Sequence, residues 1–200
     1  MNFITRIIAV SLLFVALGAE PGMAETFSER FGKGGSSFGV QGGFGYTVDL
    51  PSGDRPDISF LFLFPNYQYN IFGVVGDSWY QGALYWHVEA GGAYALNQDE
   101  KFLVGFSPIM AEYKFLSPNR NWAPTLLMGA GFSYTNWKDI AVDELGSEFQ
   151  FLVNTGAGLE FFRDRGSFSI NYRLFHISNS NIEFPNVGLN AHIFSLGMRF

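Results

Sequence analysis

The sequence contains no cysteine, which excludes disulfide bonds, a thiolate nucleophile and zinc sites built on cysteine. Charged residues are also scarce, at 15% of the chain, and the formal net charge is −6. Proteins that bind nucleic acid use a basic surface to neutralise phosphates. The composition therefore argues against nucleic acid as a partner.

Cofactor motifs and long apolar runs are missing as well. The sequence has no phosphate-binding glycine loop, no dinucleotide fingerprint and no cluster of metal ligands. We therefore expect no cofactor and no metal. Beyond the N-terminal segment no stretch predicts a membrane-spanning helix, because the aromatic run of residues 60–64 stops at Pro65.

The first 24 residues have the pattern of a secretory signal peptide. Arg6 precedes an apolar run over residues 7–17, and glycine, proline and small residues follow up to Ala24. The alternative is a membrane anchor, but the run is shorter than the ~20 residues that a spanning helix needs. We predict cleavage after Ala24 and one β-barrel domain over residues 25–200.

Apolar and polar residues alternate through the rest of the chain, and turn clusters interrupt the alternation. Successive side chains of a strand point to opposite faces, so this pattern is typical of β-strands. Pro108 predicts a bulge in the fourth strand. The second strand is apolar on both parities, which leaves its faces unassigned. Eight strands are predicted, over about residues 38–50, 58–71, 80–96, 101–116, 126–135, 149–161, 168–178 and 189–200.

An even number of strands, each long enough to cross a bilayer, favours a closed barrel. The last strand alternates apolar residues up to Phe200, which resembles the signal that outer-membrane proteins present to the barrel insertion machinery. We predict an all-β, eight-stranded antiparallel transmembrane barrel, a multi-pass protein of the bacterial outer membrane. The alternative is a soluble barrel such as a lipocalin, with the apolar ladder inside.

The residues predicted to face the lumen are polar or small. Buried charges need partners, so we interpret this set as an internal structural network with no access for substrate. Residues 138–146 are predicted to form a charged loop. The predicted inward set is Gln41, Thr47, His87, Glu89, Asn154, Glu160, Asn171 and Arg173.

Two polar residues, His176 and Ser178, continue the apolar parity of the seventh strand. A base and a hydroxyl on that face make sense if the face meets lipid and the substrate is a lipid. With periplasmic termini, this end of the strand lies at the outer rim. Asn190 shares the apolar parity of the eighth strand, so the three side chains are expected within hydrogen-bond reach.

The segment His176-Ile177-Ser178-Asn179, followed by Pro185-Asn186-Val187-Gly188, resembles the motif of the PagL-type lipid A 3-O-deacylases, an outer-membrane acyloxyacyl hydrolase family. The resemblance implies an esterase that acts on lipid A, or lipopolysaccharide, of the outer leaflet. It also implies that Ser178 is the nucleophile, that His176 is the general base and that Asn186 helps to stabilise the oxyanion.

One position departs from the family, because Asn190 stands where the resemblance leads us to expect a glutamate. An asparagine carbonyl can fix the histidine tautomer, as in papain-like proteases, but it lacks the charge that stabilises imidazolium. Asn179 and Glu183 are supporting candidates. Reduced activity, sufficient activity and a degenerate site stay open, as do a homodimer and the alternative of a non-enzymatic structural or adhesion barrel.

Overall fold

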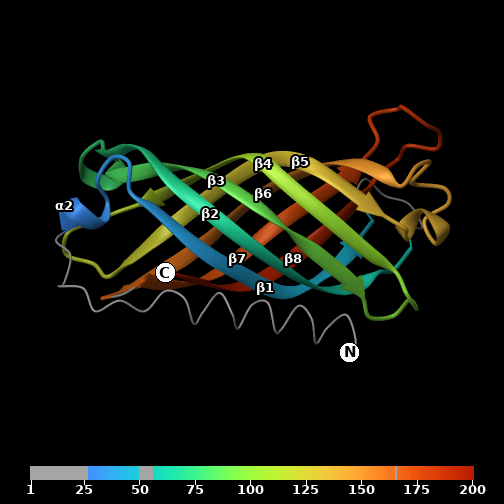
Figure 1. Ribbon diagram of the computed structural model, residues 1–200, viewed down its shortest axis with the longest axis horizontal. Helices are drawn as coiled ribbons and strands as arrows, with labels where there is room; N and C mark the ends of the chain where they lie inside the picture. The colour runs from blue at the N-terminus through green and yellow to red at the C-terminus, as the bar shows by residue number, and fades with distance from the viewer. Residues whose placement is uncertain (1–26, 50–55, 165) are drawn as a thin grey trace.

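The computed structural model describes residues 27–49, 56–164 and 166–200, and in them eight antiparallel strands close into a barrel (Figure 1). This confirms the predicted fold class. The predicted signal peptide, residues 1–24, lies outside the described residues. The strands are β1 (Ser36–Val48), β2 (Ser59–Val75), β3 (Gly82–Ala95), β4 (Phe102–Phe115), β5 (Trp122–Thr135), β6 (Phe149–Arg163), β7 (Gly166–Ser178) and β8 (Leu189–Arg199).

Each strand pairs with its neighbour in the sequence, and β1 pairs with β8 to close the sheet. Closure leaves no unpaired strand edge, which is the condition for crossing hydrocarbon with strands. The register of the β7–β8 hairpin places His176 directly opposite Asn190. The register therefore brings the candidate site together.

The apolar ladder of β8 lies on the outside of the barrel. Phe194, Leu196 and Met198 are 50%, 63% and 57% exposed, and the matching ladder of β7, which includes Tyr172 and Leu174, is also exposed. The alternative of a soluble barrel, which needs this ladder inside, is therefore wrong.

The predicted bulge at Pro108 is present. The register shifts between Phe106 and Ile109 where β4 pairs with β5, and a second shift lies on the β3 side of the same segment. Proline has no N–H to donate to the ladder, so the pairing breaks there. The carbonyl of Pro108 instead accepts a hydrogen bond from the indole N–H of Trp86 at 2.8 Å.

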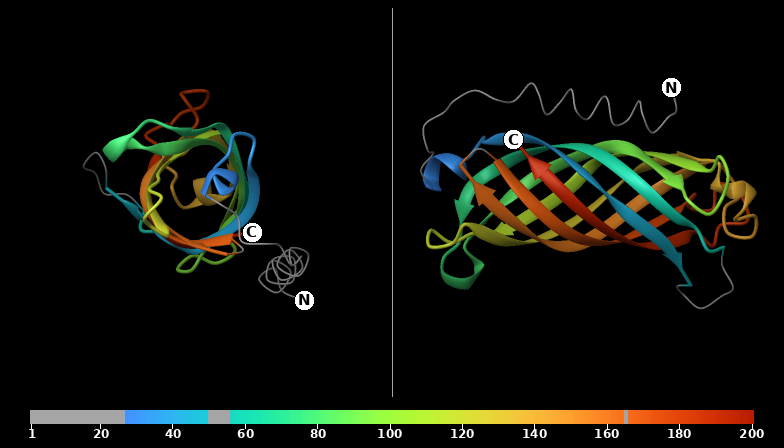
Figure 2. Two further views of the ribbon diagram at one scale, coloured as in Figure 1. Left: turned by 90° about the vertical axis from the view of Figure 1, so that its left-hand side faces the viewer. Right: turned by 90° about the horizontal axis from the view of Figure 1, so that it is seen from below.

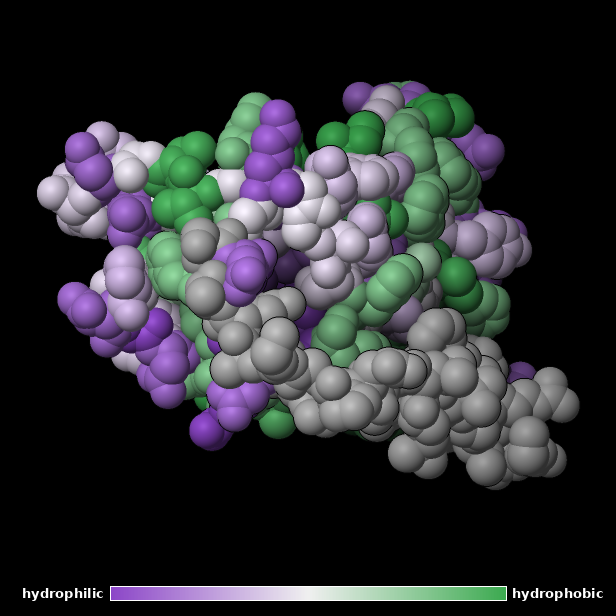
Figure 3. Space-filling view, turned by 60° about the vertical axis from the view of Figure 1, so that its left-hand side comes forward, coloured by the Kyte–Doolittle hydropathy of each residue, from purple (hydrophilic) through white to green (hydrophobic). Residues whose placement is uncertain are grey.

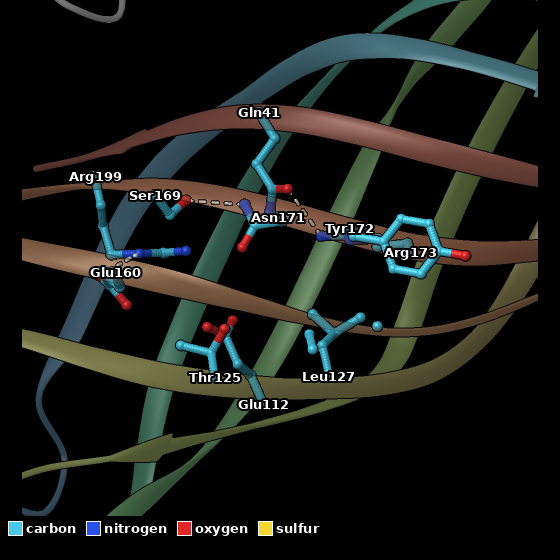
Figure 4. Close-up of a pocket in the computed structure, with 12 residues that line it drawn as sticks. Gln41, Glu112, Thr125, Leu127, Glu160, Ser169, Asn171, Tyr172, Arg173 and Arg199 are labelled. Atoms are coloured by element: carbon cyan, nitrogen blue, oxygen red, sulfur yellow. Dashed lines mark hydrogen bonds and ion pairs between the residues drawn. The ribbon is translucent and has the colours of Figure 1, made fainter.

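One part of the lumen is polar, as predicted. Arg173 pairs with Glu89 at 2.9 Å and donates to Gln41 at 3.0 Å. These partners offset the cost of burying the charges. Figure 4 shows Gln41 and Arg173 with Glu160 around a polar cavity within the barrel. All of the predicted inward set is buried except Asn171, which is half-buried.

The other part of the lumen is apolar, which the sequence did not predict. Phe60, Phe62 and Phe64 of β2 point inward, whereas Leu61 is exposed, and this assigns the faces of that strand. The inward rings join a cluster with Trp137 and other residues from the β5–β6 connection. The prediction of a polar and small lumen is therefore only partly right, because this connection folds into the barrel mouth and excludes water.

The two ends of the barrel differ. A short helix, α2 (Phe27–Arg30), lies at the end that holds the C-terminus, and Phe31 packs against Phe162 there (Figures 1 and 2). Figure 3 shows hydrophilic side chains at this end and apolar ones along the wall. None of the helices in the described part of the chain could span a bilayer. The β5–β6 and β7–β8 connections meet at the opposite end (Figure 1).

Candidate active site

The candidate site lies where β7 ends and β8 begins, at the end of the barrel opposite α2 (Figure 1). Ser178 is the last residue of β7 and Asn190 is the second residue of β8. The side chains of His176, Ser178 and Asn190 are half-buried and share the outward face of the wall with Leu174. The predicted sidedness is therefore confirmed.

Two hydrogen bonds join these three side chains. His176 Nε2 lies 3.0 Å from Ser178 Oγ, and His176 Nδ1 lies 2.9 Å from Asn190 Oδ1. An amide oxygen only accepts hydrogen bonds, so Nδ1 carries the proton of the neutral ring. The lone pair of Nε2 then faces the serine hydroxyl, which is the arrangement of a nucleophile with its general base.

Strand geometry explains the arrangement. Residues i and i+2 of a strand lie on the same face, which places His176 beside Ser178. Directly opposed residues of an antiparallel pair have Cβ atoms about 4.5–5.5 Å apart, which places Asn190 beside His176. The positions of the three residues in the sequence are thus those at which a β-hairpin places all three side chains on its outward face.

Asn186 holds the loop that follows the serine. Its Oδ1 accepts the backbone N–H of Asn179 at 2.7 Å, and its Nδ2 donates to Asn181 at 3.0 Å. In many serine esterases the N–H of the residue after the nucleophile contributes to the oxyanion hole. Here that N–H, on Asn179, is instead bonded to Asn186 Oδ1.

The two supporting candidates occupy different environments. Asn179 is fully buried, and its amide donates to the backbone carbonyl of Glu183 at 2.7 Å. Glu183 is exposed and contributes this carbonyl, whereas the Nδ1 position of His176 is taken by Asn190. Asn179 therefore braces the loop, and the structure does not bring the Glu183 carboxylate into the site.

Gly188, which belongs to the motif but received no role from the sequence, lies directly beside the site. Its φ is +76°, a conformation that favours glycine. A Cβ at this position would lie 2.7 Å from His176 Cε1 and 3.1 Å from the Cβ of Ser178. The glycine therefore lets the backbone pass against His176 and Ser178, which gives a physical reason for a glycine at this position.

Among the described residues, no group of three or more histidine, aspartate or glutamate side chains has an arrangement that could hold a metal ion. The polar cavity of Figure 4 is lined by lumenal residues such as Gln41 and Arg173. It therefore lies on the other side of the barrel wall from Ser178.

Comparison with known proteins places the chain in a family. It resembles the crystal structure of the outer-membrane enzyme PagL with 21% identity, a TM-score of 0.58 and coverage of 83% of this chain and 99% of that chain. Neisserial surface protein A, NspA, gives 14% identity, a TM-score of 0.51 and coverage of 82% and 97%. No curated protein sequence matches the chain.

The two structural likenesses show the fold. A protein-family model described as lipid A 3-O-deacylase (PagL) matches residues 63–199, which include the whole β7–β8 hairpin. Because this match covers more than half of the sequence, the chain belongs to the PagL lipid A 3-O-deacylase family.

Proposed function

We propose that this protein is an outer-membrane esterase that removes the 3-O-linked acyl chain of lipid A, with Ser178 as nucleophile and His176 as general base. The observation that carries the proposal is the pair of hydrogen bonds, 3.0 Å and 2.9 Å, that links Ser178, His176 and Asn190 on the outward face. Family membership supplies the substrate class.

In the first half-reaction, Ser178 Oγ attacks the carbonyl carbon of the ester while His176 Nε2 takes the hydroxyl proton. The tetrahedral intermediate collapses, and its bond to the sugar oxygen breaks. His176 returns the proton to that oxygen as it leaves. An acyl-serine remains, and the sugar carries a free 3-hydroxyl group.

In the second half-reaction, a water molecule attacks the acyl-serine and His176 takes its proton. Collapse of the second intermediate breaks the bond to Ser178 Oγ, which recovers the proton from His176. The fatty acid is released and the site returns to its first state. The protonation states of both groups are restored, so one ester and one water yield one alcohol and one acid.

The oxyanion needs a preorganised donor, and we assign this role to the Asn186 amide. An amide nitrogen has two N–H groups, and one of them is used by Asn181. The other would donate to the developing charge. One such donor is worth about 10²–10³-fold in kcat in serine hydrolases.

Asn190 fixes the tautomer and the orientation of His176, but it brings no negative charge to the imidazolium that forms during proton transfer. We therefore propose a working enzyme whose turnover is below that of a site with a carboxylate at this position. Glu183 does not replace the missing charge, because Asn190 already occupies the Nδ1 side of the ring.

The substrate reaches the site from the outer leaflet. The apolar outward face of β7 and β8 suits hydrocarbon, and the candidate site stands at one end of that face. Export by a signal peptide cleaved after Ala24, recognition of Phe200 by the insertion machinery and formation of a homodimer remain predictions that accompany this proposal.

The test is to express the wild-type chain and Ser178→Ala in a host whose lipid A carries the 3-position ester, and to weigh the extracted lipid A by mass spectrometry. We expect the wild type to remove one acyl chain and Ser178→Ala to remove none. The variant should still fold, because Ser178 is half-buried at the end of its strand. Its heat-modifiable gel mobility serves as the folding control.

Two outcomes would contradict the proposal. Deacylation by Ser178→Ala at the wild-type level would show that this serine is not the nucleophile. Unchanged lipid A on expression of folded wild type would favour the alternative, a non-enzymatic structural or adhesion barrel.

A further inference from the structure

The β5–β6 connection, residues 136–148, closes the mouth of the barrel at the end that holds the candidate site. Trp137, Ala141 and Leu145 are 1%, 0% and 2% exposed and lie in the apolar cluster of the lumen. The ring of Trp137 lies 5.2 Å from that of Phe60 on β2. The apolar residues of this charged connection therefore anchor it to the barrel wall, and Figure 1 shows the connection at that end of the barrel.

The same cluster contains the residues that back the candidate site. Ile177 and Leu189 point into the lumen, are 0% and 2% exposed, and belong to the cluster with Leu145. Ile177 stands between His176 and Ser178 in the sequence. Because interiors are close-packed, a change in volume at Leu145 is transmitted to the inner side of the strands that carry the site.

The connection also forms direct hydrogen bonds with the β7–β8 loop. Leu145 and Asn186 form an isolated antiparallel backbone bridge, and the N–H of Gly188 donates to the carbonyl of Glu144 at 3.1 Å. The Ser147 hydroxyl accepts a hydrogen bond from the Asn179 amide at 3.2 Å. These contacts span three positions of the loop.

Close approach between the two connections requires a glycine. A Cβ at Gly146 would lie 2.7 Å from the carbonyl carbon of Phe184 and 2.8 Å from the carbonyl oxygen of Glu183. The backbones therefore pass in direct contact. The loop that carries Asn186 and Gly188 therefore lies between this connection and the candidate site, and contacts both.

We propose that the β5–β6 connection is a positioning element for the candidate site, and that Leu145 is its principal positioning residue. Leu145 does not touch the reacting atoms. It acts through its backbone bridge to Asn186, which accepts the Asn179 N–H. The neighbouring Glu144 holds Gly188, whose backbone passes so close to His176 that an added Cβ would lie 2.7 Å from Cε1. The proposal rests on the proposed function, because it concerns the geometry of that same site.

The test uses the full-length purified protein with lipid A as substrate, and compares Leu145→Ala with two matched variants. Leu145→Met nearly keeps the side-chain volume, and Val142→Ala truncates to alanine a residue of the same connection that is 61% exposed. A displacement of about 1 Å can cost 10²-fold in rate. We expect Leu145→Ala to lower kcat about 10–100-fold with little change in KM, and the two matched variants to behave as wild type.

A second readout separates positioning from general loss of fold. The rate at which Ser178 reacts with a fluorophosphonate probe, measured per folded barrel, should fall in Leu145→Ala and recover in Leu145→Met. If Leu145→Ala does not fold, Ser147→Ala decides the matter, because it removes the contact with Asn179 and leaves the apolar packing intact. We expect a severalfold fall in kcat for that variant.

Wild-type kcat and probe reactivity in folded Leu145→Ala, with Ser178→Ala inactive, would overturn the positioning role and leave the proposed function standing. Wild-type kcat in Ser147→Ala would do the same if Leu145→Ala is unfolded. Wild-type deacylation by Ser178→Ala would instead overturn the nucleophile, and the positioning proposal with it.

Discussion

Two histidines lie on opposite faces of the barrel wall and differ in what they can reach. His87 points into the lumen and is fully buried, with its Nδ1 2.9 Å from Glu112 Oε2 and 3.0 Å from the Gln68 amide. His176 points outward, is half-buried, and lies between a hydroxyl and an amide oxygen.

The difference shows which neighbours matter. His87 lies beside the carboxylates of Glu89 and Glu112 but faces the closed interior, where these contacts link neighbouring strands. His176 has the hydroxyl that can act as a nucleophile, and it faces the side from which a lipid can come. A hydrogen-bonded histidine is therefore a candidate catalyst because of its partner and its access, whereas the number of its contacts is uninformative.

The largest expected effect comes from removing each imidazole in turn. We predict that His176→Ala lowers the kcat/KM of deacylation by about 10³-fold or more, because a general base contributes about 10²–10⁴-fold. We predict that His87→Ala leaves activity per folded barrel unchanged and lowers the free energy of unfolding by about 1–3 kcal/mol, because Glu112 and Gln68 lose a buried partner. Fatty-acid release and urea titration followed by gel mobility measure the two quantities.

The contrast between the two histidines would be contradicted if folded His87→Ala lost activity as completely as His176→Ala. That result would mean that the lumenal network, rather than the outward site, controls the chemistry.

A smaller effect is expected from Gly188→Ala. The φ of +76° and the close approach to His176 Cε1 mean that the added methyl group displaces the ring or the loop. We predict a fall in kcat of about 10–100-fold. Gly34→Ala is the matched control, since Gly34 has a φ of +84° but its added Cβ would meet only the Tyr69 hydroxyl, at 3.8 Å. Equal losses of activity in the two variants would show that backbone strain alone explains the result.

Replacing the amide of Asn190 with a carboxylate would sharpen the comparison by giving His176 the kind of partner that His87 already has. We predict that Asn190→Glu raises kcat about tenfold, which corresponds to about 1.4 kcal/mol of added stabilisation of the imidazolium in the transition state. Asn190→Leu should lower kcat, because the ring loses the acceptor that fixes its tautomer. Single-turnover release of fatty acid provides the measurement, and a lower rate in folded Asn190→Glu would contradict the prediction.

The smallest expected effect is on the pH dependence of stability, through an ion pair of the β5–β6 connection. A hydrogen bond from Lys101, 2.6 Å away, holds the pKa of Asp139 below its ordinary value of 3.8. A carboxyl group with a lowered pKa in the folded state stabilises the fold above its unfolded pKa, and this contribution is lost as the pH falls through the folded value. We predict that wild type and Lys101→Met differ in urea midpoint at neutral pH, and that the difference disappears in strong acid. A difference that persisted in strong acid would rule out the ion pair as its source.

The sequence was sufficient for the strands and for the sidedness of the site. Alternation of apolar and polar residues identifies the strands, because the two faces of each strand meet different environments. The shared face of His176, Ser178 and Leu174 follows from the two-residue period of a strand. These features depend on short stretches of chain. The direct opposition of His176 and Asn190 needed the structure, because parity gives only the face of each side chain and the loop sets the register.

The apolar part of the lumen could not be predicted in the same way. Lys138 and Asp139 mark the β5–β6 connection as a charged loop, which draws attention away from the apolar residues among them. The spacing of Trp137, Ala141 and Leu145 at intervals of four residues was the available signal, since it places three apolar side chains on one side of a helical turn.

The partners of the buried charges also lay beyond the sequence. The need of Arg173 for an acidic partner was predictable, but Glu89 lies 84 residues away in the chain. Which side chains meet across the lumen depends on the tilt and stagger of all the strands together. The anchoring of Asn179 by Asn186 depends in the same way on the shape of a loop.

Under the proposed function, the outward position of Ser178 determines how the substrate arrives and how the products leave. An enzyme with a water-facing cleft must extract a lipid from the bilayer before reacting with it, at the cost of exposing hydrocarbon. A hydroxyl on the convex wall meets its ester by lateral diffusion within the leaflet, and both products drift away in the same plane. The encounter rate then follows the number of substrate molecules per unit area of membrane.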